Sequence, residues 1–158
     1  MTVKTITGNL LESDCTTIIH QANAFATMGA GIAKQISKKY PAVLKADRNF
    51  HIPIGDAARL GHYSKADVDG PHGPLTVINL YGQYNYGRGK QTDEHAFEAA
   101  LDSILSDINR SGQPNPKVGM PYGIGCGLAG GDWTVIRRII IDLSDKHGND
   151  VHLYKFKP

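Results

Sequence analysis

The chain has 158 residues, of which 41% are hydrophobic and 20% are charged, and its formal net charge is +2. This length suits one domain with a sizeable core, and we expect a single domain over residues 1–158. No run approaches the ~18 apolar residues of a membrane helix, the N-terminus lacks the apolar segment of a signal peptide, and the charge is spread along the chain rather than gathered in a tail. Two cysteines, Cys15 and Cys126, are too few for a disulfide framework, which favours a cytoplasmic location.

The first third of the chain predicts two strands followed by two helices. Residues 2–7 alternate as a strand does, and residues 16–21 are apolar enough for a strand in the centre of a sheet. A short turn is expected between them. Apolar residues at helical spacing predict a helix from about Ala30 to Tyr40, and the proline that follows can start the next helix, over residues 42–50.

The middle of the chain predicts a hairpin and then a long helix. Residues 61–68 and 75–81 read as strands around the turn DGPHGP, and the glycines of residues 82–89 interrupt regular structure. We expect a helix over residues 92–108, with Thr92 as its cap.

The last third predicts a strand at residues 118–121, a glycine cluster at 123–131, a helix at 133–146 and a final strand at 151–156. Strands alternate with helices over most of the chain. This pattern predicts an α/β fold, in which a largely parallel sheet has helices on both faces.

Three glycine-containing loops follow apolar strands, at residues 29–31, 82–89 and 123–131. The carboxyl ends of parallel strands share one edge of a sheet, so these loops should meet there. Backbone N–H groups in such loops, and the start of the helix after residues 29–31, favour a phosphate-bearing ligand. The spacing is not the dinucleotide fingerprint GxGxxG, and a tight strand-to-helix turn without a ligand is the structural alternative at residues 17–33.

Two segments carry a resemblance to a known family. HQANAFATMGAGIA at residues 20–33 and MPYGIGCGLAGGDW at residues 120–133 together resemble the macrodomains. Within the macrodomains, the chain most resembles the branch that contains the ADP-ribose 1''-phosphate phosphatases and the terminal ADP-ribose protein glycohydrolase. It implies a three-layer α-β-α fold, with a mixed, mostly parallel six-stranded sheet, and a cleft for ADP-ribose along the strand ends.

The resemblance also implies residue roles. Asn9 stands where the family usually has an aspartate that accepts from the adenine amino group, and its amide oxygen can still accept such a bond. The first loop lies around the distal ribose and pyrophosphate, and the second cradles the diphosphate through backbone amides. Tyr154 is a candidate for stacking on adenine. The expected ADP-ribose-binding residues are Asn9, Leu10, Gln21, Asn23, Met28, Gly29, Ala30, Gly31, Ile32, Gln83, Gly125, Cys126, Gly127, Leu128 and Tyr154.

The chain departs from the glycohydrolases of this branch at two positions. They use a lysine at the end of the strand that corresponds to TVINLYGQ, where this chain has Gln83 and Tyr84, and an aspartate after GCGL, where it has Ala129. Lys90 lies several residues beyond the lysine position. These differences disfavour the lysine-dependent glycohydrolase mechanism.

His20 and Asp132 are the remaining catalytic candidates. His20 lies at the end of a central strand, at a position where phosphatase-like members also have a histidine, and it could activate water or protonate the leaving oxygen. Asp132 could orient His20 or act as the base. The structural alternatives are a hydrogen-bonding role for His20 and an N-cap role for Asp132.

These observations predict a protein that binds ADP-ribose and hydrolyses a derivative of it. The preferred substrate is ADP-ribose 1''-phosphate; the alternatives are a mono-ADP-ribosyl or O-acyl-ADP-ribose hydrolase and a non-catalytic ADP-ribose reader. The scattered histidines do not form a metal motif, so neither a metal nor a cofactor is expected. Further expectations are ADP-ribosylated macromolecules as partners, no membrane and a monomer. Tyr84 and Tyr86 could form a lid, and Arg88 could contact phosphate.

Overall fold

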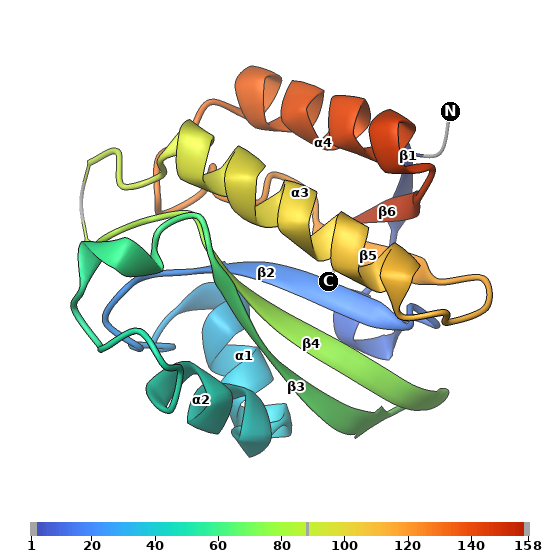
Figure 1. Cartoon of the computed structure of the whole chain (residues 1–158), viewed down its shortest axis with the longest axis horizontal. Coiled ribbons are helices and arrows are strands. Elements are labelled where there is room, and N and C mark those ends of the chain that lie inside the picture. The colour runs from blue at the N-terminus through green and yellow to red at the C-terminus, as the bar shows by residue number, and fades with distance from the viewer. Residues whose placement is uncertain (1–2, 88, 157–158) are drawn as a thin grey trace.

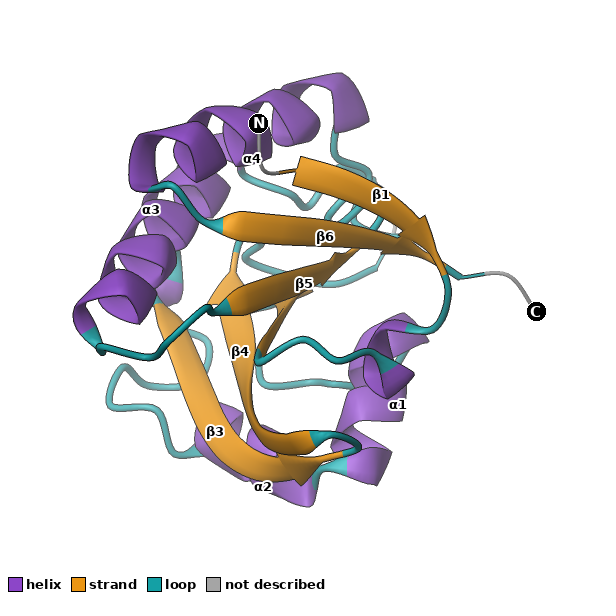
Figure 2. Cartoon of the chain, turned by 90° about the vertical axis from the view of Figure 1, so that its right-hand side faces the viewer, coloured by secondary structure: helices purple, strands orange, loops and turns teal. Residues whose placement is uncertain are grey.

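Six strands form one sheet in the order β1-β6-β5-β2-β4-β3 (Figure 2). The structure is a computed structural model and describes residues 3–87 and 89–156. The strands are β1 (Val3–Thr7), β2 (Thr17–Ala22), β3 (Tyr63–Gly70), β4 (Gly73–Tyr81), β5 (Lys117–Pro121) and β6 (Asp150–Lys155). Neighbouring strands are parallel except β3 and β4, which are antiparallel. The predicted mixed, mostly parallel sheet is therefore confirmed.

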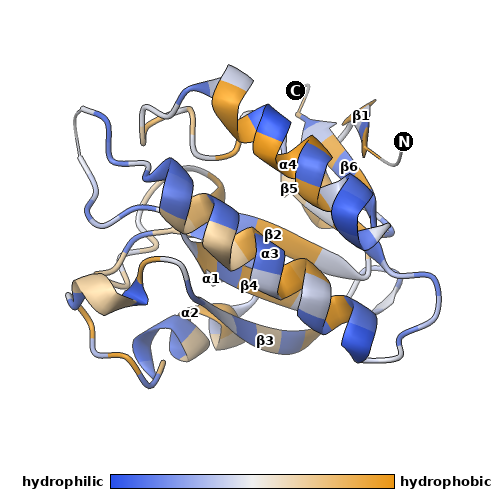
Figure 3. Cartoon of the chain, turned by 45° about the horizontal axis from the view of Figure 1, so that its top comes forward, coloured by the Kyte–Doolittle hydropathy of each residue, from blue (hydrophilic) through white to orange (hydrophobic). Residues whose placement is uncertain are grey.

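Helices cover both faces of this sheet (Figure 1). The α-helices are α1 (Gly31–Lys39), α2 (Pro41–Arg48), α3 (Glu94–Arg110) and α4 (Trp133–His147), and single 3-10 turns occur at Leu10–Glu12 and Ala57–Arg59. In Figure 1, α1 and α2 lie below the sheet and α3 and α4 lie above it. Colouring by hydropathy shows polar and apolar positions alternating along α3, as expected for a helix with one face on a core (Figure 3).

Strand β2 is the centre of the sheet and contributes to the cores on both faces. Ile19 belongs to the apolar cluster under α3 and α4, whereas Ile18 belongs to the cluster over α1 and α2. Successive side chains of a strand point to opposite faces, which explains this division. His20, two residues after Ile18, consequently points to the α1 and α2 face, and Gln21 points to the α3 face.

Two local predictions need correction. The cap of α3 is Asp93, whose side chain accepts from the Ala96 N–H, and not Thr92; the Thr92 hydroxyl donates to the Gly125 carbonyl at 2.5 Å instead. The hairpin turn is also shorter than DGPHGP, because β3 and β4 pair as far as Gly70 and Gly73.

Candidate functional site: a cleft at the carboxyl ends of the strands

A cavity of about 1150 Å³ opens at the carboxyl ends of β2 and β5. It is bordered by the loop between β2 and α1, the segment after β4 and the loop between β5 and α4. Of the residues that the sequence assigns to ADP-ribose, those that line this cavity are Gln21, Asn23, Met28, Gly29, Ala30, Gly31, Ile32, Gln83, Gly125, Gly127 and Leu128. The three predicted loops therefore meet in space.

The loop between β2 and α1 is fixed by its own side chains. Asn23 Oδ1 accepts from the Phe25 N–H at 2.9 Å, and Asn23 Nδ2 donates to Thr27 Oγ1 at 2.8 Å. Helix α1 then begins at Gly31, whose φ of 57° suits glycine, and its N-cap Ala30 makes no side-chain hydrogen bond to the helix. The first N–H groups of α1 are thus not capped by Ala30 and lie at the cavity, where an anion can accept from them.

The loop between β5 and α4 is closed by hydrogen bonds between its glycines. The Gly131 N–H donates to the Gly125 carbonyl at 2.9 Å, and the Gly130 N–H donates to the Gly127 carbonyl at 3.1 Å. A Cβ atom at Gly131 would lie 2.6 Å from the Gly125 oxygen, so this approach requires glycine. Cys126 belongs to the loop but not to the cavity lining, and burial raises the pKa of its thiol to about 11, which disfavours a thiolate.

Gln21 and Gln83 connect the end of β2 to the segment after β4 and to the loop between β5 and α4. Gln21 Nε2 donates to Gln83 Oε1 and to Thr92 Oγ1, each at 2.9 Å, and Thr92 in turn donates to the Gly125 carbonyl. Gln83 Nε2 donates to the Asn85 carbonyl at 2.7 Å. Gln83, which stands where the resemblance places the glycohydrolase lysine, therefore holds the wall of the cleft together through these hydrogen bonds.

Three aromatic side chains gather at the β2 and β4 end of the cleft. The Phe25 ring lies 5.0 Å from that of Tyr84 and 6.3 Å from that of Tyr86, both in edge-on geometry. The Tyr84 hydroxyl donates to the Gly55 carbonyl, whereas Tyr86 lines the cavity and is 57% exposed. Phe25 is not among the residues predicted from the sequence, although an aromatic residue between a central strand and the glycines at 29–31 was a visible signal. Arg88 lies outside the described residues.

The structure does not bring the two catalytic candidates together in the cleft. His20 is fully buried, its Nε2 lies 2.5 Å from Asn79 Oδ1, and it does not line the cavity. Burial lowers the pKa of His20 to about 4, so its ring is neutral at neutral pH. Asp132 accepts from the Thr134 N–H at 3.0 Å as the N-cap of α4, and it does not line the cavity either. His20 thus has the hydrogen-bonding role, and Asp132 the N-cap role, that the sequence left open as structural alternatives.

The residues assigned to adenine lie at the β1 and β6 side of the sheet, outside the cavity lining. Asn9 Oδ1 accepts from the Leu11 N–H at 3.0 Å, and Leu10 is buried. Tyr154, on the strand next to β1, has its ring 3.8 Å from the position of a Cβ at Gly8. Leu10 and Tyr154 belong to the same apolar cluster, and the amide oxygen of Asn9 is engaged by the turn that follows it.

Asp47 lines the cavity from α2 and is not among the residues predicted from the sequence. Its Oδ1 accepts from Arg59 Nη1 at 3.0 Å and from the Tyr81 hydroxyl at 2.7 Å, and the Asp47 and Arg59 side chains are 1% and 0% exposed. Burial raises the pKa of Asp47, and the Tyr81 and Arg59 contacts oppose this rise. The signal in the sequence was the spacing, because Asp47 follows the apolar Val43 by one helical turn; the structure buries both on the same face of α2.

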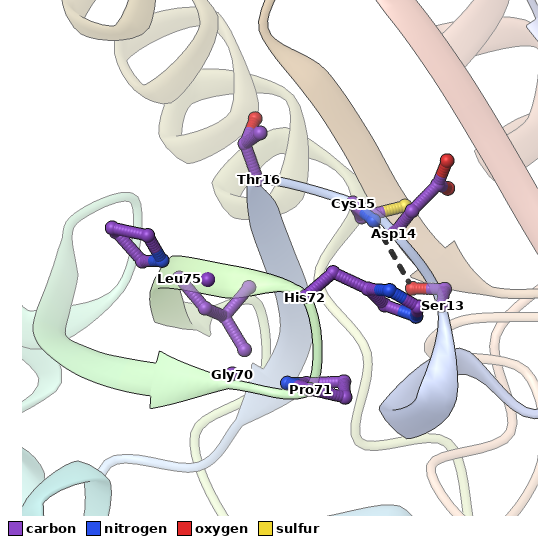
Figure 4. A pocket seen from close by; sticks show the side chains of 10 residues that line it. Ser13, Asp14, Cys15, Thr16, Gly70, Pro71, His72 and Leu75 are labelled. Atoms are coloured by element: carbon purple, nitrogen blue, oxygen red, sulfur yellow. Dashed lines mark hydrogen bonds between the residues drawn. The ribbon is translucent and has the colours of Figure 1, made fainter.

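A second, much smaller cavity of about 40 Å³ lies at the opposite end of the sheet, where β2 and β4 begin (Figure 4). Ser13, Cys15 and His72 are among the residues around it, and the Cys15 N–H donates to Ser13 Oγ at 3.4 Å. It is too small for a nucleotide. Within residues 3–87 and 89–156, no group of three His, Cys, Asp or Glu side chains could hold a metal ion, and no helix is long and apolar enough to cross a membrane.

Comparisons with known proteins extend these findings. No family model matches the chain. An uncharacterized 17.5 kDa protein of Enterobacteria phage T4 is 33% identical over 152 residues, which cover 92% of each chain. A Bacteroides thetaiotaomicron structure of unknown function is 25% identical, covers 97% of both chains and has a TM-score of 0.79.

Two further structures share the fold at lower identity. The macrodomain of Mycobacterium tuberculosis DarG is 22% identical, with a TM-score of 0.73 over 99% of this chain and 97% of that one. Thermosipho africanus DarTG in complex with ADP-ribose is 16% identical, with a TM-score of 0.78 over 97% of this chain and 41% of that one. The chain therefore belongs to the same family as the phage T4 protein, and its fold is that of a macrodomain.

Proposed function

We propose that the protein binds ADP-ribose in the cleft at the carboxyl ends of β2 and β5. The loop between β2 and α1, the start of α1 and the glycine-rich loop between β5 and α4 all meet at one cavity of about 1150 Å³, and this convergence carries the proposal. Backbone N–H groups in such loops, and at a helix start, are the donors that a diphosphate needs. The fold shared with Thermosipho africanus DarTG, whose structure holds ADP-ribose, supports the same ligand.

The order of the strands suggests how the ligand lies. The diphosphate would accept from the loops after β2 and β5, at the middle of the sheet. The adenosine would extend toward β6 and β1, where Asn9 and Tyr154 lie, and the distal ribose toward β4, where Asn23, Gln83 and Tyr86 line the cavity. This orientation keeps the roles that the resemblance implies.

Hydrolysis of ADP-ribose 1''-phosphate is the reaction to test first, because loops that bind the diphosphate through backbone amides can also bind the 1''-phosphate group. The reaction also needs a proton for the departing sugar oxygen. Among the described residues that line the cavity, only Asp47 and Tyr86 have ionisable side chains, and His20 and Asp132 are engaged elsewhere. This lining favours a second candidate, an ADP-ribose reader without catalysis.

Calorimetry with ADP-ribose tests binding, and phosphate release from ADP-ribose 1''-phosphate tests the reaction. We expect the wild-type chain to bind ADP-ribose; undetectable binding would refute the proposal. Turnover that is lost in Asp132→Ala but kept in Asp56→Ala would establish the phosphatase, since Asp56 is also an N-cap, for the 3-10 turn at Ala57–Arg59. His20→Ala should be compared in the same assay. Intact binding without turnover would assign the reader function.

A further inference from the structure

Helices α1 and α2 carry five exposed basic residues, which are Lys34, Lys38, Lys39, Lys45 and Arg48. The one acidic residue of these helices, Asp47, has a side chain that is 1% exposed and is paired with Arg59, outside both helices. Lys39 pairs with Glu12 at 2.8 Å. The other four form no ion pair with any residue that the structure describes, and we call Lys34, Lys38, Lys45 and Arg48 the basic face.

The basic face lies on the outer sides of two neighbouring helices. Its two lysines on α1 are four residues apart, and Lys45 and Arg48 on α2 are three apart, so each pair shares one side of its helix. Buried Ile36 and Val43 mark the opposite sides, which pack on the protein. Figures 1 and 2 both show α1 and α2 together on one face of the sheet, away from α3 and α4. The four charges therefore belong to one surface.

The helices on the other face of the sheet do not share this charge. Helices α3 and α4 carry six acidic and four basic residues. Three of the basic ones, Arg110, Arg138 and Lys146, each pair with an aspartate of these helices, at 2.7, 3.8 and 3.1 Å. The formal net charge of the whole chain is only +2, so positive charge is concentrated on the α1 and α2 side. Such an asymmetry attracts an anionic partner to that side.

The absence of apolar side chains from the basic face narrows the choice of anionic partner. The exposed large hydrophobic residues of the described chain all lie outside α1 and α2. Helices that bind membranes insert apolar side chains, and protein interfaces usually have an aromatic or apolar centre, so neither partner fits. Single-stranded nucleic acid stacks its bases on exposed aromatic rings, which these two helices also lack. A duplex is bound through its phosphates by charge alone, as the basic face requires.

We propose that the basic face binds the phosphate backbone of double-stranded DNA. Lysine and arginine side chains donate hydrogen bonds and accept none, which suits phosphate oxygens, and backbone contacts of this kind carry no sequence preference. Helix α1 begins at the large cavity, where Gly31, Ile32 and Ala33 belong to the lining, so a bound duplex would lie beside the cleft. None of the four basic residues lines the cavity. The inference therefore goes beyond the proposed function and does not require ADP-ribose to bind.

Fluorescence anisotropy with a labelled DNA duplex of mixed sequence, in the absence of ADP-ribose, tests the proposal. Four phosphate contacts predict a slope of roughly −3 to −4 when the logarithm of the association constant is plotted against that of the salt concentration. The affinity should then fall roughly a hundredfold between about 50 and about 200 mM salt. No binding at the lower salt concentration, or tighter binding of a single strand of the same length, would overturn the inference.

Two double variants separate the basic face from total charge. Lys34→Gln with Lys38→Gln, and Arg137→Gln with Arg138→Gln, each remove two exposed cations from one helix. We expect the first to lower duplex affinity roughly tenfold to a hundredfold at the lower salt concentration and to make the slope shallower by about 2. The second, on α4, should stay within about threefold of the wild type, because long-range charge is screened by salt. Equal losses in the two variants would overturn the inference.

Vesicles of phosphatidylserine and phosphatidylcholine test the membrane alternative. At the same salt concentration, sedimentation should leave the wild-type chain in solution, because the basic face offers no apolar side chain for insertion. Retention on the vesicles that is lost in the Lys34→Gln and Lys38→Gln variant would assign the basic face to a membrane and overturn the inference. Both double variants should keep the wild-type melting temperature, since the replaced side chains are exposed.

Discussion

His20 in β2 and Asn79 in β4 are register partners in the sheet, and their side chains meet at 2.5 Å in the protein interior. Asn79 also donates to the Val43 carbonyl at 3.2 Å, so the pair attaches the centre of the sheet to α2. His20 is consequently part of the scaffold under the cleft.

Burial of His20 in its neutral form should make the stability of the protein depend on pH. The pKa of His20 is about 4 in the folded protein, against 6.5 for an unperturbed histidine, so between these values the unfolded state binds more protons. The stability due to neutral His20 is complete above pH 6.5 and is lost as the pH falls toward 4, at up to about 1.4 kcal/mol per pH unit. Urea unfolding at pH 7 and pH 5 measures this loss.

His20→Asn removes the titrating group and isolates its effect. The loss of stability from pH 7 to pH 5 should be smaller by about 1–2 kcal/mol in this variant than in the wild type. His95→Asn, at an exposed position, should keep the wild-type difference. An equal pH dependence in His20→Asn and wild type would show that His20 is not buried in its neutral form.

Gly31, at the start of α1, should not tolerate a long or charged side chain when ADP-ribose binds. Gly31→Glu puts bulk and a negative charge where we expect the diphosphate, and we expect ADP-ribose affinity to fall roughly a hundredfold or more in calorimetry. Gly31→Ala shares the backbone strain of a residue at φ 57° but adds neither charge nor length. Similar affinities of the two variants would place the diphosphate elsewhere.

The glycines of the second loop should differ in their tolerance of a methyl group. A Cβ at Gly131 would meet the Gly125 oxygen at 2.6 Å, whereas a Cβ at Gly127 has nothing within 4 Å. Gly131→Ala should therefore lower the free energy of unfolding by about 1–3 kcal/mol, as overpacking does, and Gly127→Ala should leave it nearly unchanged. Thermal and urea unfolding of the two variants would contradict this account if their stabilities were equal.

The buried ion pair should matter far more than an exposed one. Arg59→Met leaves the Asp47 carboxylate without its cation in a site that is 1% exposed, and we expect a loss of about 3–5 kcal/mol. Arg110→Met breaks a contact with Asp107 whose arginine is 76% exposed, and the expected loss is below about 1 kcal/mol. Equal losses in urea unfolding would show that Asp47 is not buried with its charge.

Tyr86 should distinguish ADP-ribose from ADP. Tyr86 is exposed at the end of the cleft that we assign to the distal ribose, and its ring contacts Phe25 rather than the sheet. Tyr86→Ala should lower the affinity for ADP-ribose by roughly threefold to tenfold and leave that for ADP unchanged, because ADP lacks the distal ribose. A loss for ADP of the same size would move Tyr86 away from the ribose.

The local sequence determined much of this architecture. The apolar run from Thr17 predicted a central strand, and the structure places Ile18 and Ile19 of this strand in the cores on opposite faces. Asp132 before the last helix was recognisable as an N-cap, because a carboxylate one residue before a helix can accept from its first N–H groups. The convergence of the glycine-rich loops followed from the parallel strands that precede them.

Tertiary structure decided what each polar side chain does. Strand periodicity shows that His20 and Gln21 point to opposite faces, but it does not show which face carries the cleft, and so it could not separate a catalytic His20 from a buried one. Thr92 was predicted as the cap of α3, but its hydroxyl donates to the Gly125 carbonyl, 33 residues away, and Asp93 caps the helix instead. The contacts of Asp47 with Arg59 and Tyr81 depend on the packing of α2 against β4. Contacts between residues that are distant in the chain leave no local pattern in the sequence, so these partners could not be predicted.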